Sequence, residues 1–231
     1  MKLLLCSDFS GVSYRYVKKF FKATNGLNCL FVGYAQEDEF ELESGSALVF
    51  RQMGMNVISL TKSYDFKDKI DVIFVRGGNT TRLIHYLREY NQYEKIKQLV
   101  ENQDVLYIGN SAGAVLVGTD TAWTLPSEPY EYDLVKLYGD NALKGFGWIN
   151  KLVFVHCSKY RLCWSHEMEN ENDIFRTLDN ECYPAFVEDK KIYQKDEYLK
   201  IDNNQAYYVN GEEQKMLTYN WSHLPIKSPK L

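Results

Sequence analysis

The sequence predicts an α/β protein in which helices cover both faces of a mainly parallel central sheet. Short apolar runs typical of buried strands alternate with segments whose apolar residues recur at helical spacing. Polar or glycine-rich turns follow several of the apolar runs, as at the carboxyl ends of parallel strands. The chain has 231 residues and is 45% hydrophobic, so we expect one full core and a single domain over residues 1–231.

The first half of the chain repeats strand, turn and helix. The expected strands are apolar runs: Met1–Cys6, Leu30–Tyr34, Met55–Leu60, Ile70–Val75 and the run that begins at Val105. The expected helices lie between them: Tyr14–Ala23, Ser44–Met53 with Gly54 as its C-terminal cap, Thr81–Tyr90 and Gln92–Asn102. This order favours parallel strands, and ligands of such sheets bind at the carboxyl ends of the strands.

The second half is less regular. Residues 120–141 contain two prolines and several acidic residues, which predicts a long loop that either walls a pocket or covers the core. The other expected elements, in order, are a strand at Lys151–Val155, a helix at Met168–Leu178, a strand at Tyr183–Val187 and short strands within Ile192–Ile201, Ala206–Val209 and Met216–Tyr219. The last three predict a small antiparallel margin near the C-terminus.

The stretch Gly109-Asn110-Ser111-Ala112-Gly113 has the spacing of a nucleophile turn between a strand and a helix. Small flanking residues allow the sharp bend that holds a serine out at the end of the strand. The N–H groups at the start of the following helix suit a developing oxyanion. The alternative interpretation is a turn of small residues that packs a helix tightly onto the sheet.

A nucleophilic serine needs a base and a group that orients the base. Of the four histidines, His156 alone directly ends a predicted core strand, so it is the candidate base. Glu188 and Asp189 follow another predicted strand, and either carboxylate is a candidate partner for His156. The Gly77-Gly78 turn, at a neighbouring strand end, is the candidate second oxyanion donor beside Ala112, because glycine permits close approach of the backbone. The alternative is a phosphate-binding loop, whose spacings are absent there.

Composition restricts the class of partner. The net charge of −4, with acidic and basic residues interspersed, provides no footprint for nucleic acid or an anionic membrane. The five cysteines are an odd number without metal-type spacing, and the sequence shows no apolar leader or long apolar span. We therefore expect a cytoplasmic protein with reduced thiols and no membrane association, whose partners are small molecules or peptides.

Three features together resemble the peptidase E (aspartyl dipeptidase) family of serine peptidases, which belongs to the same superfamily as the cyanophycinases. They are Gly77-Gly78-Asn79-Thr80, Gly109-Asn110-Ser111-Ala112-Gly113-Ala114 and the strand-end residue His156. The resemblance implies a flavodoxin-like three-layer sandwich related to class I glutamine amidotransferases. It also implies cleavage after an N-terminal aspartate without metal or cofactor.

By motif match, the resemblance makes Ser111 the nucleophile, His156 the base, and the N–H groups of Gly78 and Ala112 the oxyanion donors. The third member in the family is a glutamate before a small residue, whereas here Glu188 precedes Asp189 and Lys190. We prefer Glu188 and keep Asp189 as the alternative. The chain order of an α/β-hydrolase would instead recruit Asp120 or Asp133.

The sequence leaves the substrate and the assembly open. A site for an aspartyl side chain needs a cation, and Arg76 and Arg161 are the candidates. The expected partner is a small peptide, and the expected state is a monomer or homodimer. Two rival functions remain: a non-catalytic binding or regulatory protein on the same fold, and a hydrolase of another acyl substrate such as an ester or a β-linked aspartyl polymer.

Overall fold

The computed structural model describes residues 1–7, 9, 17–18, 20–37, 45–122, 124, 133–150 and 152–156, and the strand backbone of residues 197–202, 205–210 and 213–217. Its central sheet has five strands: β1 (Lys2–Cys6), β2 (Asn28–Val32), β3 (Asn56–Ser59), β4 (Val72–Val75) and β5 (Leu106–Asn110). The strand order is β1-β5-β4-β2-β3, and every neighbouring pair is parallel. The strands predicted in the first half of the sequence are therefore confirmed.

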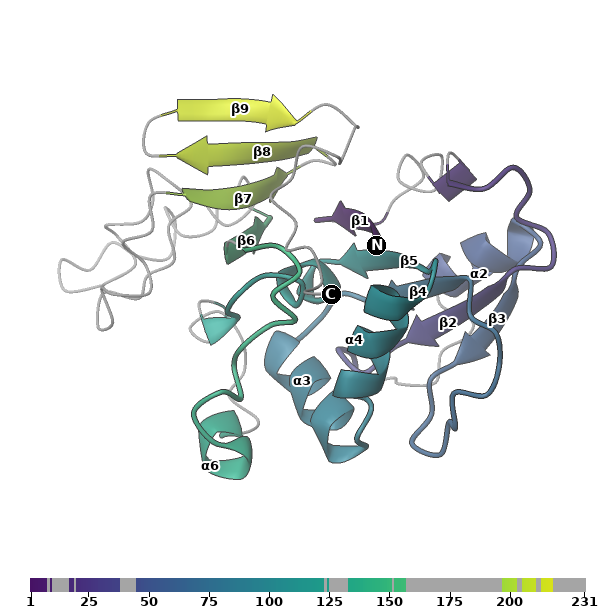
Figure 1. Cartoon of the computed structure of the whole chain (residues 1–231), viewed down its shortest axis with the longest axis horizontal. Coiled ribbons are helices and arrows are strands. Elements are labelled where there is room, and N and C mark those ends of the chain that lie inside the picture. The colour runs from purple at the N-terminus through teal and green to yellow at the C-terminus, as the bar shows by residue number, and fades with distance from the viewer. Residues whose placement is uncertain are drawn as a thin grey trace, which may run out of the picture.

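Helices cover both faces of this sheet (Figure 1). Leu5, Val75 and Tyr107 belong to a core cluster that also contains buried residues of α3 (Thr80–Glu89), α4 (Tyr93–Asn102) and α5 (Ala112–Val115). The adjacent strand residues, such as Leu4, Phe74 and Ile108, point to the opposite face of the sheet. They pack with buried residues of α2 (Gly45–Gln52). Because both faces are buried, the strands are apolar at nearly every position, which explains their uninterrupted apolar runs.

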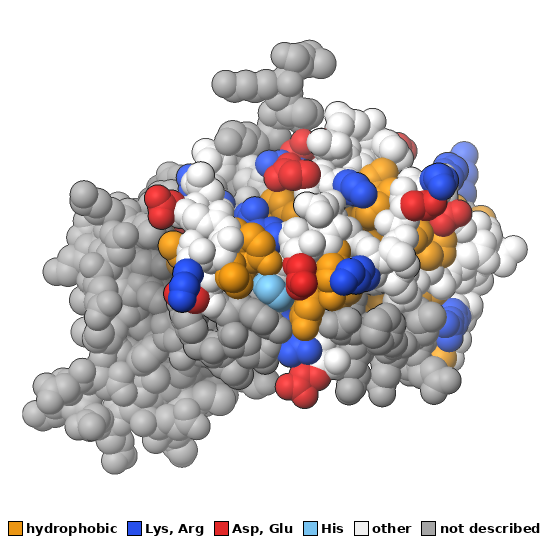
Figure 2. Space-filling view, turned by 90° about the horizontal axis from the view of Figure 1, so that it is seen from below, with side chains coloured by type: hydrophobic (Ala, Val, Ile, Leu, Met, Phe, Trp, Pro, Cys, Tyr) orange, Lys and Arg blue, Asp and Glu red, His pale blue; other side chains and the backbone are white. Residues whose placement is uncertain are grey.

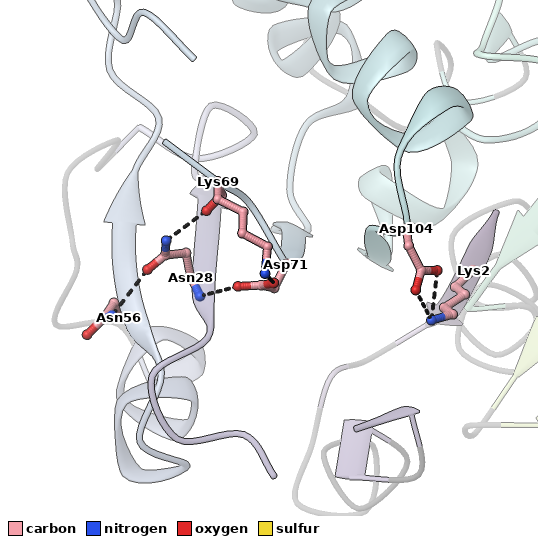
Figure 3. Close-up of polar contacts among 6 residues, drawn as sticks. All are labelled: Lys2, Asn28, Asn56, Lys69, Asp71 and Asp104. Carbon is pink, nitrogen blue, oxygen red and sulfur yellow. Dashed lines mark hydrogen bonds and ion pairs between the residues drawn. The ribbon is translucent and has the colours of Figure 1, made fainter. Parts of the chain in front are cut away.

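Polar contacts join the amino ends of several strands on the opposite side from the turns that follow them (Figure 3). The Asn28 backbone N–H donates to Asp71 at 3.0 Å, and the Asn28 side chain bridges to Lys69 and Asn56. Lys2 Nζ forms an ion pair with Asp104 at 2.8 Å, and the ion pair lowers the pKa of the Asp104 carboxyl. These contacts align the starts of the strands. The turns that contain the candidate site residues lie at the opposite, carboxyl ends of the strands.

The helix predicted after Ser111 is short. α5 ends at Val115 because the chain beyond it bonds to a distant segment instead of continuing the helical pattern. Leu116 O and Val117 O accept from the N–H groups of Phe146 and Ile149, at 2.7 and 3.1 Å. The helix predicted after Ser111 is therefore present, and it is short because tertiary hydrogen bonds compete with helix propagation.

The segment from 120 to 141 is not only a loop. It contains α6 (Leu134–Tyr138), whose N-cap Asp133 accepts from the Lys136 N–H at 3.1 Å. The Tyr138 hydroxyl lies 3.0 Å from His85 Nδ1, so α6 contacts α3. Of the helix predicted at 14–23, residues 17, 18 and 20 are helical, residues 21–23 are not, and residues 14–16 and 19 lie outside the described residues. The helix predicted at 168–178 and the strand predicted at 183–187 lie wholly outside the described residues.

A second sheet lies beyond β1, the edge strand of the first sheet (Figure 1). It consists of β6 (Leu152–Val155), β7 (Glu197–Asp202), β8 (Gln205–Asn210) and β9 (Glu213–Leu217). β6 pairs parallel with β7, and the remaining pairs are antiparallel. β6 is the strand predicted at 151–155, and it ends immediately before His156.

The surface drawn in Figure 2 carries Lys and Arg side chains interspersed with Asp and Glu, with hydrophobic side chains between them. Among the described residues, no helix has the length and apolar character required to span a bilayer. Cys6 and Cys29 are buried and form no disulfide among the described residues, while Cys157, Cys163 and Cys182 lie outside the described part.

Candidate active site

Ser111 occupies a sharp turn between β5 and α5. Its backbone has φ 47° and ψ −107°, a conformation that is uncommon for a residue with a side chain. The turn is held because the Ser111 N–H donates to Cys6 O at the end of β1, at 2.8 Å. The predicted sharp turn between a strand and a helix is therefore present, with the serine between two strand ends.

The glycines on either side of Ser111 are required by packing. A Cβ atom on Gly109 would lie 2.5 Å from Gly113 O, and one on Gly113 would lie 2.5 Å from Val75 O. The Tyr107 hydroxyl donates to Gly113 O at 2.8 Å from inside the core. Burial, aided by Tyr93, raises the pKa of the Tyr107 hydroxyl well above its usual range, so Tyr107 stays a protonated donor.

His156 approaches Ser111 from the second sheet. It follows β6 directly and has φ 56°, so it too has a left-handed backbone conformation. Its Nε2 atom lies 2.8 Å from Ser111 Oγ, and its backbone N–H donates to Ser7 Oγ at 3.2 Å. Cys6 and Ser7, at the end of β1, therefore anchor the backbones of Ser111 and His156.

The Gly77-Gly78 turn follows β4, which is the neighbour of β5 in the sheet. A Cβ atom on Gly77 would lie 2.8 Å from the Cβ atom of Ser111, so only glycine allows the turn to approach the serine this closely. Gly78 has φ 145°, and a Cβ atom there would lie 2.2 Å from Ala35 O. The structure thus brings the turn to the side of Ser111.

Two backbone N–H groups beside the serine have no acceptor among the residues that the structure describes. Among the residues the structure describes, neither the Gly78 N–H nor the Ala112 N–H donates to a protein atom. Ala112 is buried, where a backbone donor normally has a partner, whereas Gly78 is exposed. Both N–H groups are available to an acceptor that arrives with a ligand. A carbonyl oxygen that gains negative charge is such an acceptor.

The other predicted site residues divide into two groups. Arg76 lies one residue before Gly77, and its backbone N–H donates to Val32 O at 3.0 Å. Glu188, Asp189 and Arg161 lie outside the described residues.

The two acids that an α/β-hydrolase order would recruit have local partners instead. Asp120 accepts from the Ala122 N–H at 2.7 Å. Asp133 caps α6 by accepting from the Lys136 N–H.

Sequence reasoning missed two residues of this neighbourhood, Ser7 and Gln36. Ser7 follows the first predicted strand, and the rule that selected His156 by its place at a strand end also applies to it. Gln36 donates from Nε2 to Gly77 O at 2.6 Å, and no pattern in the sequence indicates this contact. Each contact joins segments far apart in the chain.

Comparisons with known proteins identify the family of the chain. The model of peptidase family S51 matches residues 3–217. The chain is 32% identical over 136 residues to "Peptidase E" of Haemophilus influenzae, covering 54% of this chain and 61% of that protein. It is 32% identical over 115 residues to the "Probable alpha-aspartyl dipeptidase" of Drosophila melanogaster, covering 48% of each.

The aligned part of the chain therefore spans less than two thirds of the length of these relatives. Among solved structures, the "Putative Peptidase E Protein" of Listeria monocytogenes superposes with a TM-score of 0.59 at 22% identity. That superposition covers 94% of this chain and 100% of the other, and it supports the shared fold. Since the family model matches nearly the whole chain, the protein belongs to peptidase family S51.

Proposed function

We propose that the chain is a serine peptidase that hydrolyses short peptides, with dipeptides that begin with aspartate as its preferred substrates. The observation that carries the proposal is the 2.8 Å distance between His156 Nε2 and Ser111 Oγ, on a serine held in a strained turn. A base within hydrogen-bond reach of a serine hydroxyl is the arrangement that activates a serine nucleophile.

In the proposed reaction, Ser111 Oγ attacks the peptide carbonyl carbon while His156 Nε2 takes the hydroxyl proton. The carbonyl oxygen becomes an oxyanion that accepts hydrogen bonds from the N–H groups of Gly78 and Ala112. His156 then gives its proton to the leaving amine, which leaves an ester on Ser111. A water molecule attacks this acyl-enzyme as His156 takes its proton, and the proton returns to Ser111 Oγ as the acid product leaves.

The proposal assigns Glu188 to hold His156 through the other ring nitrogen, with Asp189 as the alternative. Because Nε2 faces Ser111, the Nδ1–H group is the one that a carboxylate would accept from. Orientation of this kind keeps the imidazole in the tautomer that can take the serine proton.

Two observations support the choice of substrate. The relatives named above are called peptidase E and alpha-aspartyl dipeptidase. Arg76 also lies in the chain directly before the Gly77-Gly78 turn, where a guanidinium can pair with a substrate carboxylate. Arg161, which lies outside the described residues, is the other candidate cation.

The test combines covalent labelling with a matched pair of substrates. We expect intact-mass spectrometry to show one adduct after treatment with a fluorophosphonate, and no adduct on the Ser111→Ala variant. We also expect hydrolysis of an Asp-Leu dipeptide to be faster than that of Asn-Leu, which has the same shape without the charge.

Each part of the proposal can fail separately. Absence of a Ser111-dependent adduct, together with absence of turnover, would favour a non-catalytic binding protein. An adduct without dipeptide turnover, but with hydrolysis of an ester or a β-linked aspartyl polymer, would favour the other acyl hydrolase. Equal rates for Asp-Leu and Asn-Leu would remove the aspartate preference and leave the serine peptidase in place.

The contact between Ser7 and His156 leads to a smaller prediction. The Ser7→Ala change removes the acceptor of the His156 N–H, so the strained backbone of His156 loses a support. A neutral hydrogen bond of this kind contributes about 1 kcal/mol, which corresponds to about a fivefold decrease in kcat. Steady-state kinetics on the preferred dipeptide measure the decrease.

The matched control is Ser59→Ala at the end of β3, the edge strand farthest from β1 in the sheet. That variant should keep the wild-type kcat. If Ser7→Ala also keeps it, the hydroxyl of Ser7 has no part in placing the histidine.

A further inference from the structure

The loop that follows β2 is joined to the Gly77-Gly78 turn by two hydrogen bonds. Gln36 Nε2 donates to Gly77 O at 2.6 Å, and the Asn79 N–H donates to Ala35 O at 2.8 Å. The loop is itself closed by the Gln36 N–H, which donates to Gly33 O at 3.0 Å. Gly78 therefore lies between two residues, Gly77 and Asn79, that are each hydrogen-bonded to the loop after β2.

These contacts fix the direction of the peptide between Gly77 and Gly78. In a trans peptide the carbonyl and the following N–H point in opposite directions. Because Gln36 holds the Gly77 carbonyl, the Gly78 N–H points away from Gln36. That N–H is also one of the two that have no acceptor among the described residues.

The orientation needs an external support because both residues are glycine. Glycine adopts positive and negative φ with similar ease, so the backbone alone does not prevent this peptide from turning over. In the reversed orientation, the Gly77 carbonyl would occupy the place of the donor and would repel an oxyanion. The turn lies against the nucleophile, since a Cβ atom on Gly77 would be 2.8 Å from Ser111 Cβ.

We propose that Gln36 is a positioning residue that holds the Gly77-Gly78 peptide with its N–H available to the oxyanion. The inference rests on the proposed serine peptidase activity, and it extends the site to a loop that no catalytic motif includes. Gln36 does not touch the reacting atoms, and it acts only through the Gly77 carbonyl.

The test replaces Gln36 with a residue of similar length that has no donor. Complete removal of an oxyanion donor lowers kcat by about 100- to 1000-fold. Loss of its orientation alone should cost less, so we expect Gln36→Met to lower kcat by about 10- to 100-fold. KM should stay within about twofold, because the oxyanion forms only after substrate has bound.

A second readout reports on the oxyanion site directly. A peptide aldehyde adds to a catalytic serine and places its oxygen at the oxyanion position. We expect Gln36→Met to lower the affinity for the aldehyde by the same factor by which it lowers kcat. If Gln36 had a merely structural role, the substitution would instead lower the melting temperature and change KM, and the decreases in kcat and in aldehyde affinity would not match.

A third variant and a control complete the series. Gln36→Glu places a carboxylate oxygen against the Gly77 carbonyl, so kcat should fall further than in Gln36→Met. The ratio of its activity to the wild type should rise as the pH falls, because a protonated glutamate donates again. Gln52→Met, at the exposed end of α2, should keep wild-type kinetics.

The results distinguish the inference from the activity on which it rests. If the wild type hydrolyses dipeptides and Gln36→Met has the same kcat and aldehyde affinity, the role of Gln36 is overturned and the activity stands. A decrease in Gln36→Met that appears only in stability or KM overturns it as well. If the wild type neither turns over peptides nor reacts with a fluorophosphonate, the proposed function and the role of Gln36 fall together.

Discussion

Replacement of either Ser111 or His156 is expected to lower kcat by a factor on the order of 10⁴ to 10⁶, and replacement of both is expected to cost no more. The two side chains act on one proton, since His156 Nε2 lies 2.8 Å from Ser111 Oγ. Without the base, the hydroxyl is a poor nucleophile, and without the hydroxyl the base has no proton to take. Single-turnover kinetics of Ser111→Ala, His156→Gln and the double variant measure the three losses.

His85→Gln is the matched control for the histidine. His85 lies on α3, where it contacts Tyr138 and Glu89 rather than the serine. This variant should keep kcat within about twofold. Losses that multiply in the double variant would show that Ser111 and His156 act independently, which would contradict a shared proton transfer.

The second large effect is on folding. Gly113→Ala is expected to destabilise the protein by roughly 3 kcal/mol, at the upper end of the cost of overpacking. The added methyl would lie 2.5 Å from Val75 O and 2.8 Å from Val75 Cβ, and the strand backbone cannot move aside without disturbing the sheet. A protein of this size should lose about 6 to 12 °C in melting temperature. Thermal and urea unfolding measure the change.

Gly45→Ala provides the matched control. A Cβ atom on Gly45, the first residue of α2, would meet nothing within 4 Å. That variant should be neutral or more stable by a few tenths of a kcal/mol, because alanine favours a helix. If Gly113→Ala is as stable as Gly45→Ala, close packing against Val75 does not require glycine at position 113.

Much of the central sheet was predictable from local pattern. The runs before Cys6, Val75 and Asn110 are apolar at nearly every position because both faces of the sheet are covered. The strand before His156 was predictable for the same reason. Local pattern did not predict the end of α5, which depends on hydrogen bonds from Phe146 and Ile149 to the preceding turn.

By itself, the sequence determined which segments become strands and that Ser111 and His156 each follow one, because burial and turn chemistry are encoded in neighbouring residues. Only the tertiary structure decided the 2.8 Å contact between them, since Ser111 and His156 follow strands of different sheets. It also decided that Ser7 supports the histidine and that Gln36 holds the Gly77 carbonyl. Such contacts join residues far apart in the chain, so no local pattern specifies them.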